Sequence, residues 1–282
     1  MQVFFIVLAL LFFACKDNKD EIENKKDYNN KKLQNVSSNK ELTNNVIPVF
    51  SIKVLKTIPH DTLAFTQGLF FHDGYLYEST GQYEHSSLRK INPITGKIEK
   101  MVNIGAEYFA EGIALHNGKI FLLTWQNNTC FVFDSKTFRK EKELVYAGEG
   151  WGLTNYDQQF LVQSDGTNIL KIIDPMDFSI QSSIAVFADI YPVSNLNELE
   201  NIEGKIWANI WLKDSIAVID KNSGKVDFFV DVSSLRNYLQ PNSNVDVVNG
   251  IAYDNKTKKI FLTGKLWPYI FEIELIQKSV YN

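Results

Sequence analysis

Three residues that could support acid–base chemistry, Glu111, Asn197 and Lys265, lie at the ends of short apolar segments in this 282-residue sequence. A carboxyl group can move a proton, an amide can hold a polar group, and a lysine can stabilise negative charge. Taken alone, Glu111 fits a structural ion pair equally well. Because the three are far apart in the sequence, the fold has to bring them together before they can act on one substrate.

The elements that could do so are copies of one repeated pattern. An apolar strand, a tight polar turn and a second strand occur five times, starting near residues 68, 112, 152, 199 and 250. Residues 73–74, 117–118 and 203–204 are predicted hairpin turns, because Gly and Asn tolerate positive φ. A second hairpin follows each of the first four copies. The fifth is followed only by a third strand at 270–275, close to the end of the chain.

The strand missing from the fifth copy is available at 49–58, ahead of the first copy. A period of about 45 residues with four strands is typical of propellers. We therefore predict an all-β fold, a five-bladed β-propeller closed by an N-terminal strand that completes the last blade. Closure removes exposed strand edges. A stacked solenoid is the alternative, but it requires parallel coils and atypical end repeats. Residues 189–196 and 232–239 are the candidates for a helix.

This topology predicts one rim where polar and aromatic residues gather. In a blade the first strand is innermost and the second is antiparallel to it, so the first strand begins where the second ends. The predicted rim residues are Phe65, Gln67, Phe109, Glu111, Trp151, Asn197, Glu198 and Asn249 from first strands, and Glu78, Trp125, Ser164, Asp165, Asn209, Trp211 and Lys265 from second strands, with Trp267 nearby. Large aromatics around carboxylates, amides and one lysine indicate a pocket for a small molecule or a chain terminus. Any single aromatic could instead cover the core, but packing alone would scatter tryptophans over both rims.

A set of short motifs carries a family resemblance. They are FTQGL at 65–69, YESTG at 77–81 with SSLR at 86–89, EGI at 111–113, LTW at 123–125, GWGLT at 150–154, SDGT at 164–167, NELE at 197–200, WANIW at 207–211, VNGIA at 248–252 and LTGKLWP at 262–268. Each is weak alone, but together and in this order they resemble the plant-type and bacterial glutaminyl cyclases. These are five-bladed propellers, also called glutaminyl-peptide cyclotransferases. The resemblance runs from about residue 50 to 275.

The resemblance implies that the chain closes an N-terminal glutamine of peptides or proteins to pyroglutamate and releases ammonia. Glu111 matches the family's proton-shuttling glutamate, and apolar surroundings would raise its pKa toward that of the α-amine. Asn197 is expected to hold the substrate through hydrogen bonds, and Lys265 to donate to the developing oxyanion or to pair with Glu111. The expected substrate-binding residues are Phe65, Gln67, Phe109, Trp125, Trp151 and Trp211.

No cofactor or catalytic metal is expected. His60, His72, His85 and His116 show no ligand spacing, and two cysteines cannot form a four-thiolate site. Two other functions compete with cyclisation. A lactonase-like propeller hydrolase would need metal-binding acids and amides in the channel. A lipid-tethered propeller binding module would need no catalysis at all, because many propellers only bind.

The N-terminal part is expected to lie outside the fold. Residues 1–15 are predicted to be a signal peptide with a lipobox-like end, because an apolar run at 3–14 stops at Cys15, the candidate lipidation site. A cleaved soluble export signal and a misassigned start are the alternatives. Residues 16–47 are predicted to be a disordered Asn/Lys-rich tether, or a terminus without a role, and residues 48–282 the catalytic propeller.

Composition limits the remaining partners and the location. With 29 Lys and Arg against 33 Asp and Glu, the net charge of −4 argues against nucleic-acid binding. We expect an exported protein, either a membrane-anchored lipoprotein or periplasmic, that contacts the membrane only through its lipid. A closed ring has no edge that demands a partner, so a monomer is expected.

Cys130 lies in an apolar strand and is expected to be buried and inert.

Overall fold

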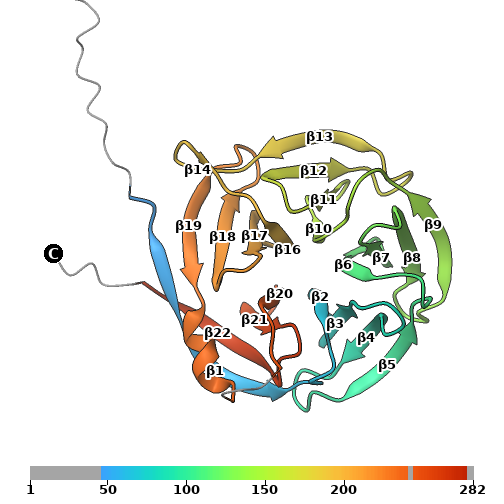
Figure 1. Ribbon diagram of the computed structural model, residues 1–282, viewed down its shortest axis with the longest axis horizontal. Helices are drawn as coiled ribbons and strands as arrows, with labels where there is room; N and C mark the ends of the chain where they lie inside the picture. Colours follow the sequence, from blue (N-terminus) through green and yellow to red (C-terminus); the bar gives the residue numbers. More distant parts are fainter. Residues whose placement is uncertain (1–45, 241–243, 278–282) are drawn as a thin grey trace, which may run out of the picture. The chain divides into compact units, whose positions relative to one another are not determined.

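The computed structural model describes residues 46–240 and 244–277, and nearly all of their regular structure is β-strand (Figure 1). The predictions for the signal segment, for Cys15 and for the tether up to residue 45 lie outside the described residues. Within the described ranges, no helix has the length and apolar character needed to cross a membrane.

Three separate sheets each contain four consecutive antiparallel strands. The first has β2 (Thr66–His72), β3 (Tyr75–Thr80), β4 (Ser87–Ile91) and β5 (Ile98–Asn103). The second has β6 (Ala110–His116), β7 (Lys119–Thr124), β8 (Thr129–Asp134) and β9 (Lys140–Val145). The third has β10 (Leu153–Asn155), β11 (Leu161–Gln163), β12 (Ile169–Ile173) and β13 (Ile180–Ala185).

The remaining long strands form one eight-stranded sheet in the order β16-β17-β18-β19-β1-β22-β21-β20. Its strands are β1 (Val49–Pro59), β16 (Leu196–Ile202), β17 (Lys205–Ile210), β18 (Ser215–Asp220), β19 (Val226–Asp231), β20 (Val248–Asp254), β21 (Lys259–Gly264) and β22 (Tyr269–Gln277). The N-terminal strand β1 pairs antiparallel with β22 along its length, and parallel with β19 at Val49–Ser51. The predicted pairing of the first strand with the last is therefore confirmed.

The sheets are arranged around a central axis (Figure 1). Strand β2 contacts β6, β6 contacts β10, β10 contacts β16, β16 contacts β20, and β20 contacts β2. Burial decreases from the strands near the axis to the strands at the outside. Every residue of inner strand β20 is buried, whereas outer strand β9 is almost entirely exposed. The fold is therefore all-β and propeller-like, with the core between neighbouring sheets and the inner strands around the axis.

The local predictions for turns are confirmed, and those for helices only in part. Asp73 and Gly74 have φ values of 47° and 81°, as a tight hairpin turn requires. The only helix in the described residues is a 3-10 helix, η1 (Ser233–Tyr238), inside the predicted 232–239 stretch. The 189–196 stretch is not helical. Asp189 adopts a φ of 57°, which turns the chain back so that β14 (Phe187–Ala188) pairs with β15 (Tyr191–Pro192).

The inner strands share one irregularity that positions the site. The pairing register shifts at Thr66/Gly68, Ala110/Ile113, Leu196/Leu199 and Val248/Ile251. Each of these β-bulges places one residue out of the regular alternation and redirects its side chain. The residues carried by the bulges are Gln67, Glu111, Asn197 and Asn249. The same local distortion thus presents a polar side chain near the axis from four different strands.

Candidate active site

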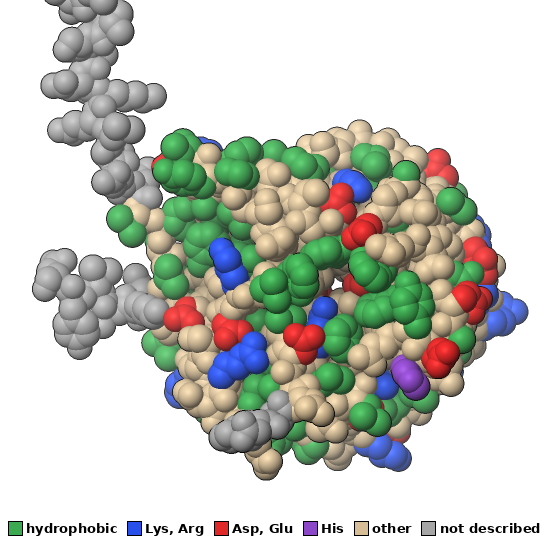
Figure 2. All heavy atoms as spheres, viewed as in Figure 1, with side chains coloured by type: hydrophobic (Ala, Val, Ile, Leu, Met, Phe, Trp, Pro, Cys, Tyr) green, Lys and Arg blue, Asp and Glu red, His purple; other side chains and the backbone are tan. Residues whose placement is uncertain are grey.

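A cavity of about 350 Å³ gathers the residues that the sequence predicted at the rim. It is lined by Phe65, Gln67, Phe109, Glu111, Trp125, Trp151, Asn197, Trp211, Asp246 and Lys265. All nine predicted catalytic and substrate-binding residues are in this set, and Asp246 is the addition. Their placement agrees with the strand-end reasoning, while their chemical roles stay predictions. Apolar side chains also gather around the middle of the face in Figure 2, with acidic and basic groups among them.

Aromatic rings in edge-to-face contact make up the cavity wall. The rings of Phe65 and Phe109 have centroids 6.0 Å apart, and those of Phe109 and Trp125 are 5.8 Å apart. Trp151 and Trp211 form another pair at 5.6 Å. Edge-to-face packing fixes the rings relative to one another. The rings in the wall therefore restrict one another's orientation.

Glu111 is the buried carboxyl group of this cavity, with 5% of its surface exposed. Gln67 Nε2 donates a hydrogen bond to Glu111 Oε1 at 3.0 Å. Asn249 Nδ2 in turn donates to Gln67 Oε1 at 3.2 Å and to the Thr66 carbonyl at 3.0 Å. Since Gln67 accepts from Asn249, its amide nitrogen is turned toward Glu111. The bulge residues of β2, β6 and β20 are thus linked in one chain of hydrogen bonds.

The charge state of Glu111 is set mainly by its burial. Burial raises the pKa of Glu111 well above its ordinary value, the positive charge of Lys265 acts in the opposite direction, and the negative charge of Glu149 adds to the rise. Burial likewise lowers the pKa of Lys265, while Glu111 and Asp246 oppose that change. A carboxyl group with a raised pKa can accept a proton and return it near neutral pH.

Asn197 and Lys265 complete the polar set. Asn197 is 3% exposed, and within the described part of the chain its Oδ1 atom has no hydrogen-bond partner. A buried acceptor without a partner is costly, and a bound donor would relieve that cost. Lys265 is 5% exposed, and its Nζ lies 4.8 Å from the centre of the Phe65 ring. Both groups can therefore contact a polar ligand inside the cavity.

Sequence reasoning missed Glu149, which lies between β9 and β10. Its Oε2 atom accepts hydrogen bonds from the indole nitrogens of Trp125 and Trp151, each at 2.9 Å, and its Oε1 accepts one from Gln126 at 3.0 Å. The site residues were predicted from their positions at the ends of repeated strands, and a residue in a loop has no such position. The only available hint was its position two residues before Trp151.

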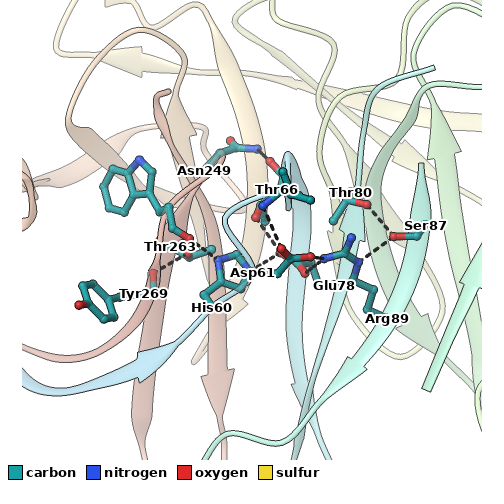
Figure 3. A network of polar contacts seen from close by, with 12 residues as sticks. His60, Asp61, Thr66, Glu78, Thr80, Ser87, Arg89, Asn249, Thr263 and Tyr269 are labelled. Carbon is teal, nitrogen blue, oxygen red and sulfur yellow. Dashed lines mark hydrogen bonds and ion pairs between the residues drawn. The ribbon is translucent and has the colours of Figure 1, made fainter. Parts of the chain in front are cut away.

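Glu78 was predicted at the rim but instead belongs to a buried network beside the cavity (Figure 3). Its carboxylate pairs with His60 at 2.9 Å and accepts a hydrogen bond from Thr66 at 2.6 Å, and Arg89 lies 3.8 Å away. Burial would lower the pKa of His60, but its pairing with Glu78 outweighs this and raises it. Arg89 also pairs with Asp61 at 2.9 Å. Glu78 therefore does not line the cavity, and it joins the segment after β1 to β2 and β4.

Trp267 lies beside the cavity, as its predicted place near the rim implied. It is fully buried, packs edge-to-face on Phe271 with centroids 6.0 Å apart, and donates its indole N–H to the Asp246 carbonyl at 3.0 Å. Its ring is therefore part of the core of the eight-stranded sheet. It supports the Asp246 segment from behind and does not line the cavity.

The other predicted rim residues serve as links between strands. Ser164 Oγ donates to the Asn197 carbonyl at 2.6 Å, and Asn209 Oδ1 accepts from the Gly250 nitrogen at 3.0 Å. Glu198 accepts from the backbone nitrogens of Leu69 at 3.2 Å and Ile251 at 2.9 Å. Asp165 pairs with Lys171 at 2.9 Å. The Ser164, Asn209 and Glu198 contacts therefore join segments from different strand repeats.

Metal-ligating side chains do not cluster in residues 46–240 and 244–277. No group of three or more His, Cys, Asp or Glu side chains there could hold an ion. Cys130 is buried as predicted, and burial raises the pKa of its thiol. A second cavity of about 510 Å³ lies near Glu200, Lys221 and Tyr253, at the opposite ends of the inner strands, and none of the predicted site residues lines it.

Comparison with known proteins agrees with this geometry. Residues 29–275 match the glutamine cyclotransferase family model. The chain is 38% identical over 232 residues to the glutaminyl-peptide cyclotransferase of Arabidopsis thaliana, covering 81% of this chain and 72% of that protein. The crystal structure of Myxococcus xanthus glutaminyl cyclase superposes with a TM-score of 0.77 at 35% identity, covering 82% of this chain and 99% of that one. The chain belongs to the glutamine cyclotransferase family.

Proposed function

We propose that this protein is a glutaminyl-peptide cyclotransferase that converts the N-terminal glutamine of peptides and proteins to pyroglutamate with release of ammonia. The observation that carries the proposal is Glu111, a buried carboxyl group with a raised pKa and a hydrogen bond from Gln67, inside an aromatic cavity. Similarity to two glutaminyl cyclases supports the same reaction.

The reaction needs one proton to move twice. The α-nitrogen of the substrate attacks its own side-chain amide carbon, so a carbon–nitrogen bond forms and the amide oxygen gains negative charge. Glu111 accepts the proton that the attacking nitrogen loses. It returns a proton to the departing nitrogen, the old carbon–nitrogen bond breaks, and ammonia leaves. One carboxyl group can serve both steps when its pKa is close to that of an α-amine, about 7.7–8.0 in its reference state.

The other polar side chains hold the reacting groups. The Oδ1 atom of Asn197 accepts a hydrogen bond from the substrate amine or amide, which supplies its missing partner. Lys265 stabilises the oxyanion that forms during attack. Gln67, which Asn249 holds in place, fixes the Glu111 carboxyl group beside the substrate.

The aromatic wall has a different task. A glutamine side chain must fold back on its own amine, which costs conformational entropy. The Phe109–Trp125 pair and the Trp151–Trp211 pair confine it and exclude water. This confinement favours ring closure over hydrolysis of the same amide.

A mass-spectrometric assay tests the proposal. The purified protein is incubated with a peptide that begins with Gln and, as a control, with the same peptide beginning with Asn. Only the Gln peptide should lose about 17 Da, the mass of ammonia, and a chelator should not change the rate. A folded protein that leaves the Gln peptide unchanged would instead indicate a binding module without catalysis.

We also propose the finer features of the architecture. The four-stranded units would be five blades, with β1 as the outer strand of the last blade, and this is supported by the β1–β22 pairing and the cycle of inner strands. With its ring closed, the chain acts as a monomer.

The protein is proposed to be exported and anchored to the membrane through Cys15, with residues 16–47 as the tether. Substitution Cys15→Ser should move the protein from the membrane fraction to the soluble fraction.

A further inference from the structure

The side-chain contacts in the cavity wall form two separate runs. Along one side, Lys265 lies over the Phe65 ring, Phe65 contacts Phe109, and Phe109 contacts Trp125. On the other side, Trp151 contacts Trp211. Between Trp125 and Trp151 the link is the Glu149 carboxylate, which accepts a hydrogen bond from each indole.

We propose that Glu149 is a positioning residue of this site, which holds the rings of Trp125 and Trp151 in the orientation that closes the cavity around the substrate. The inference rests on the cyclotransferase activity proposed above. It adds to that activity a residue that does not line the cavity, and that acts through two residues that do.

The backbone contacts explain why such a residue is needed. Gly150 N donates to the Trp125 carbonyl at 3.2 Å, and Trp151 N donates to the Ser164 carbonyl at 3.0 Å. These bonds fix the main chain at both tryptophans, and ring packing places Trp125 on Phe109 and Trp151 on Trp211, but none of these contacts joins one indole to the other. Each indole has one N–H donor, and one shared carboxylate oxygen determines where both donors point.

The Glu149 loop is itself held firmly. A Cβ atom at Gly150 would collide with the Tyr146 hydroxyl, so the chain can pass close to Tyr146 only with glycine there. Gly112 N donates to the Trp151 carbonyl at 2.7 Å, which joins the loop to the strand that carries Glu111. Burial acts to raise the pKa of Glu149, but the hydrogen bonds from Trp151, Gln126 and Trp125 outweigh it and hold the pKa below its usual value. The carboxylate is therefore charged at neutral pH.

That charge also acts on Glu111, where it adds to the rise in pKa that burial causes. The charged groups that act on Glu111 are Lys265, which lowers its pKa, and Glu149, which raises it. Near Glu149, the negative charge of Asp165, which pairs with Lys171 at 2.9 Å, acts to raise the pKa of Glu149. Loss of the Glu149 charge should therefore lower the pKa of Glu111.

Two substitutions separate the hydrogen bonds from the charge. Glu149→Gln keeps an acceptor for the indoles but removes the charge, whereas Glu149→Ala removes both. Glu99→Gln, on exposed strand β5, is the matched control for loss of a carboxylate. The measurements are kcat and KM for the Gln-initiated peptide across pH, the melting temperature, and the indole N–H signals in a nitrogen–proton NMR spectrum.

We expect Glu149→Ala to raise KM roughly tenfold, the effect of losing a hydrogen bond to a charged group, and Glu149→Gln to recover most of that loss. In both variants the limb of the kcat/KM profile that reports Glu111 should move to lower pH. Of the five indole signals, those of Trp125 and Trp151 should shift in the Ala variant, with Trp125→Phe and Trp151→Phe providing their assignment. The control should match the wild type in every readout.

Three results would overturn the inference. One is an Ala variant with wild-type KM and pH profile. Another is loss of activity that only follows a fall in melting temperature, with an unchanged pH profile, which would assign Glu149 a purely structural role. The third is indole signals at their wild-type positions in the Ala variant. Wild-type protein that releases no ammonia would reject the proposed function, and the indole signals would still test the hydrogen-bonded link separately.

Discussion

Glu111 shows how a single side chain acquires its chemistry from its surroundings. On the surface its carboxyl group would be ionised at neutral pH. In the cavity it is 5% exposed, burial raises its pKa, and its carboxylate accepts a hydrogen bond from the Gln67 amide. A residue that must both accept and return a proton needs such a balance.

The first prediction concerns this carboxyl group. Glu111→Gln preserves the size and polarity of the side chain but cannot exchange a proton, so turnover of a Gln-initiated peptide should fall by about 10²–10⁴-fold. The melting temperature should not fall, because Gln removes a buried acid without leaving a cavity. Ammonia release and thermal unfolding are measured together, with exposed Glu143→Gln as the control. Near-wild-type turnover in Glu111→Gln would reject the proton-shuttle role.

A second residue-scale prediction concerns Glu200, beside the larger cavity. Burial raises its pKa to about 8, although hydrogen bonds from Thr154 and from the Tyr253 and Asn201 backbone oppose the rise. Because the folded pKa is above the unfolded value, the folded state binds the proton more tightly. This contribution to stability is complete below the unfolded pKa and is lost as pH rises toward 8.

Glu200→Gln removes that dependence. The melting temperature of the variant, relative to wild type, should rise between pH 5 and pH 9. Glu203→Gln is an informative control because the hydrogen bond from Lys258 lowers the pKa of Glu203, so its contribution is already complete above the unfolded value and its effect should stay constant between pH 5 and pH 9. Parallel melting curves for Glu200→Gln and wild type across this range would contradict the prediction.

At this scale the sequence predicted which residues meet, but not all of their partners. Glu111, Asn197 and Lys265 could be found because each lies where a repeated strand begins or ends. Glu149 is in a loop, outside that rule. Glu78 satisfied the rule yet does not line the cavity, because its buried charge is paired with His60, a contact between distant segments that no local pattern contains.

At the scale of the element, the decisive feature is the close approach of neighbouring inner strands. A Cβ atom at Gly112 would lie 2.6 Å from the Leu153 nitrogen, and one at Gly68 would lie 2.6 Å from the Ile113 nitrogen. At Gly152 the obstacle is the Asn197 carbonyl oxygen. Glycine lets the strands come near enough to place their bulge residues around one cavity.

Gly152→Ala tests this approach. The added methyl group has no room, so β10 and β16 must separate, which should cost about 1–3 kcal/mol of unfolding free energy and reduce turnover through Trp151 and Asn197. Gly118→Ala is the control for backbone strain without a clash, since a Cβ there meets nothing within 4 Å but a φ of 74° strains an alanine, so it should lose some stability and keep wild-type turnover. Denaturant unfolding compares the two. A Gly152→Ala variant with wild-type stability and turnover would show that the strands can move apart freely.

The repeated strands and hairpin turns could be read from the sequence because alternation and turn residues are local signals. The 189–196 segment could not be. Its apolar and polar residues fit a short helix, and the positive φ of Asp189 that makes it a hairpin depends on packing against other parts of the fold.

At the scale of the whole molecule, β1 joins the two ends of the described fold. It pairs with β22 from Phe50 to Pro59 and contacts β19 at its start. Without β1, β19 and β22 would both present unpaired edges. The sequence pattern was sufficient to predict this because the fifth repeat lacked a strand and one was available upstream.

Truncation separates the roles of the N-terminal segments. A chain that begins at residue 46 should retain the melting temperature and turnover of the full chain, whereas one that begins at residue 60 should be poorly soluble and inactive. Circular dichroism, solubility and ammonia release are compared for both. A soluble, active chain lacking residues 46–59 would show that β1 is dispensable for the fold.

The β1–β22 pairing also has a consequence for folding kinetics. Phe50 pairs with Gln277, so the contacts that complete the eight-stranded sheet have the largest sequence separation in the described fold. On a ribosome, the first strand is made long before β22 and stays without this main partner until the last strand emerges. High contact order slows folding, so docking of β1 should be the late, slow step of refolding. Until it occurs, both open edges can pair with other chains, which makes the window before closure the time when aggregation competes with folding.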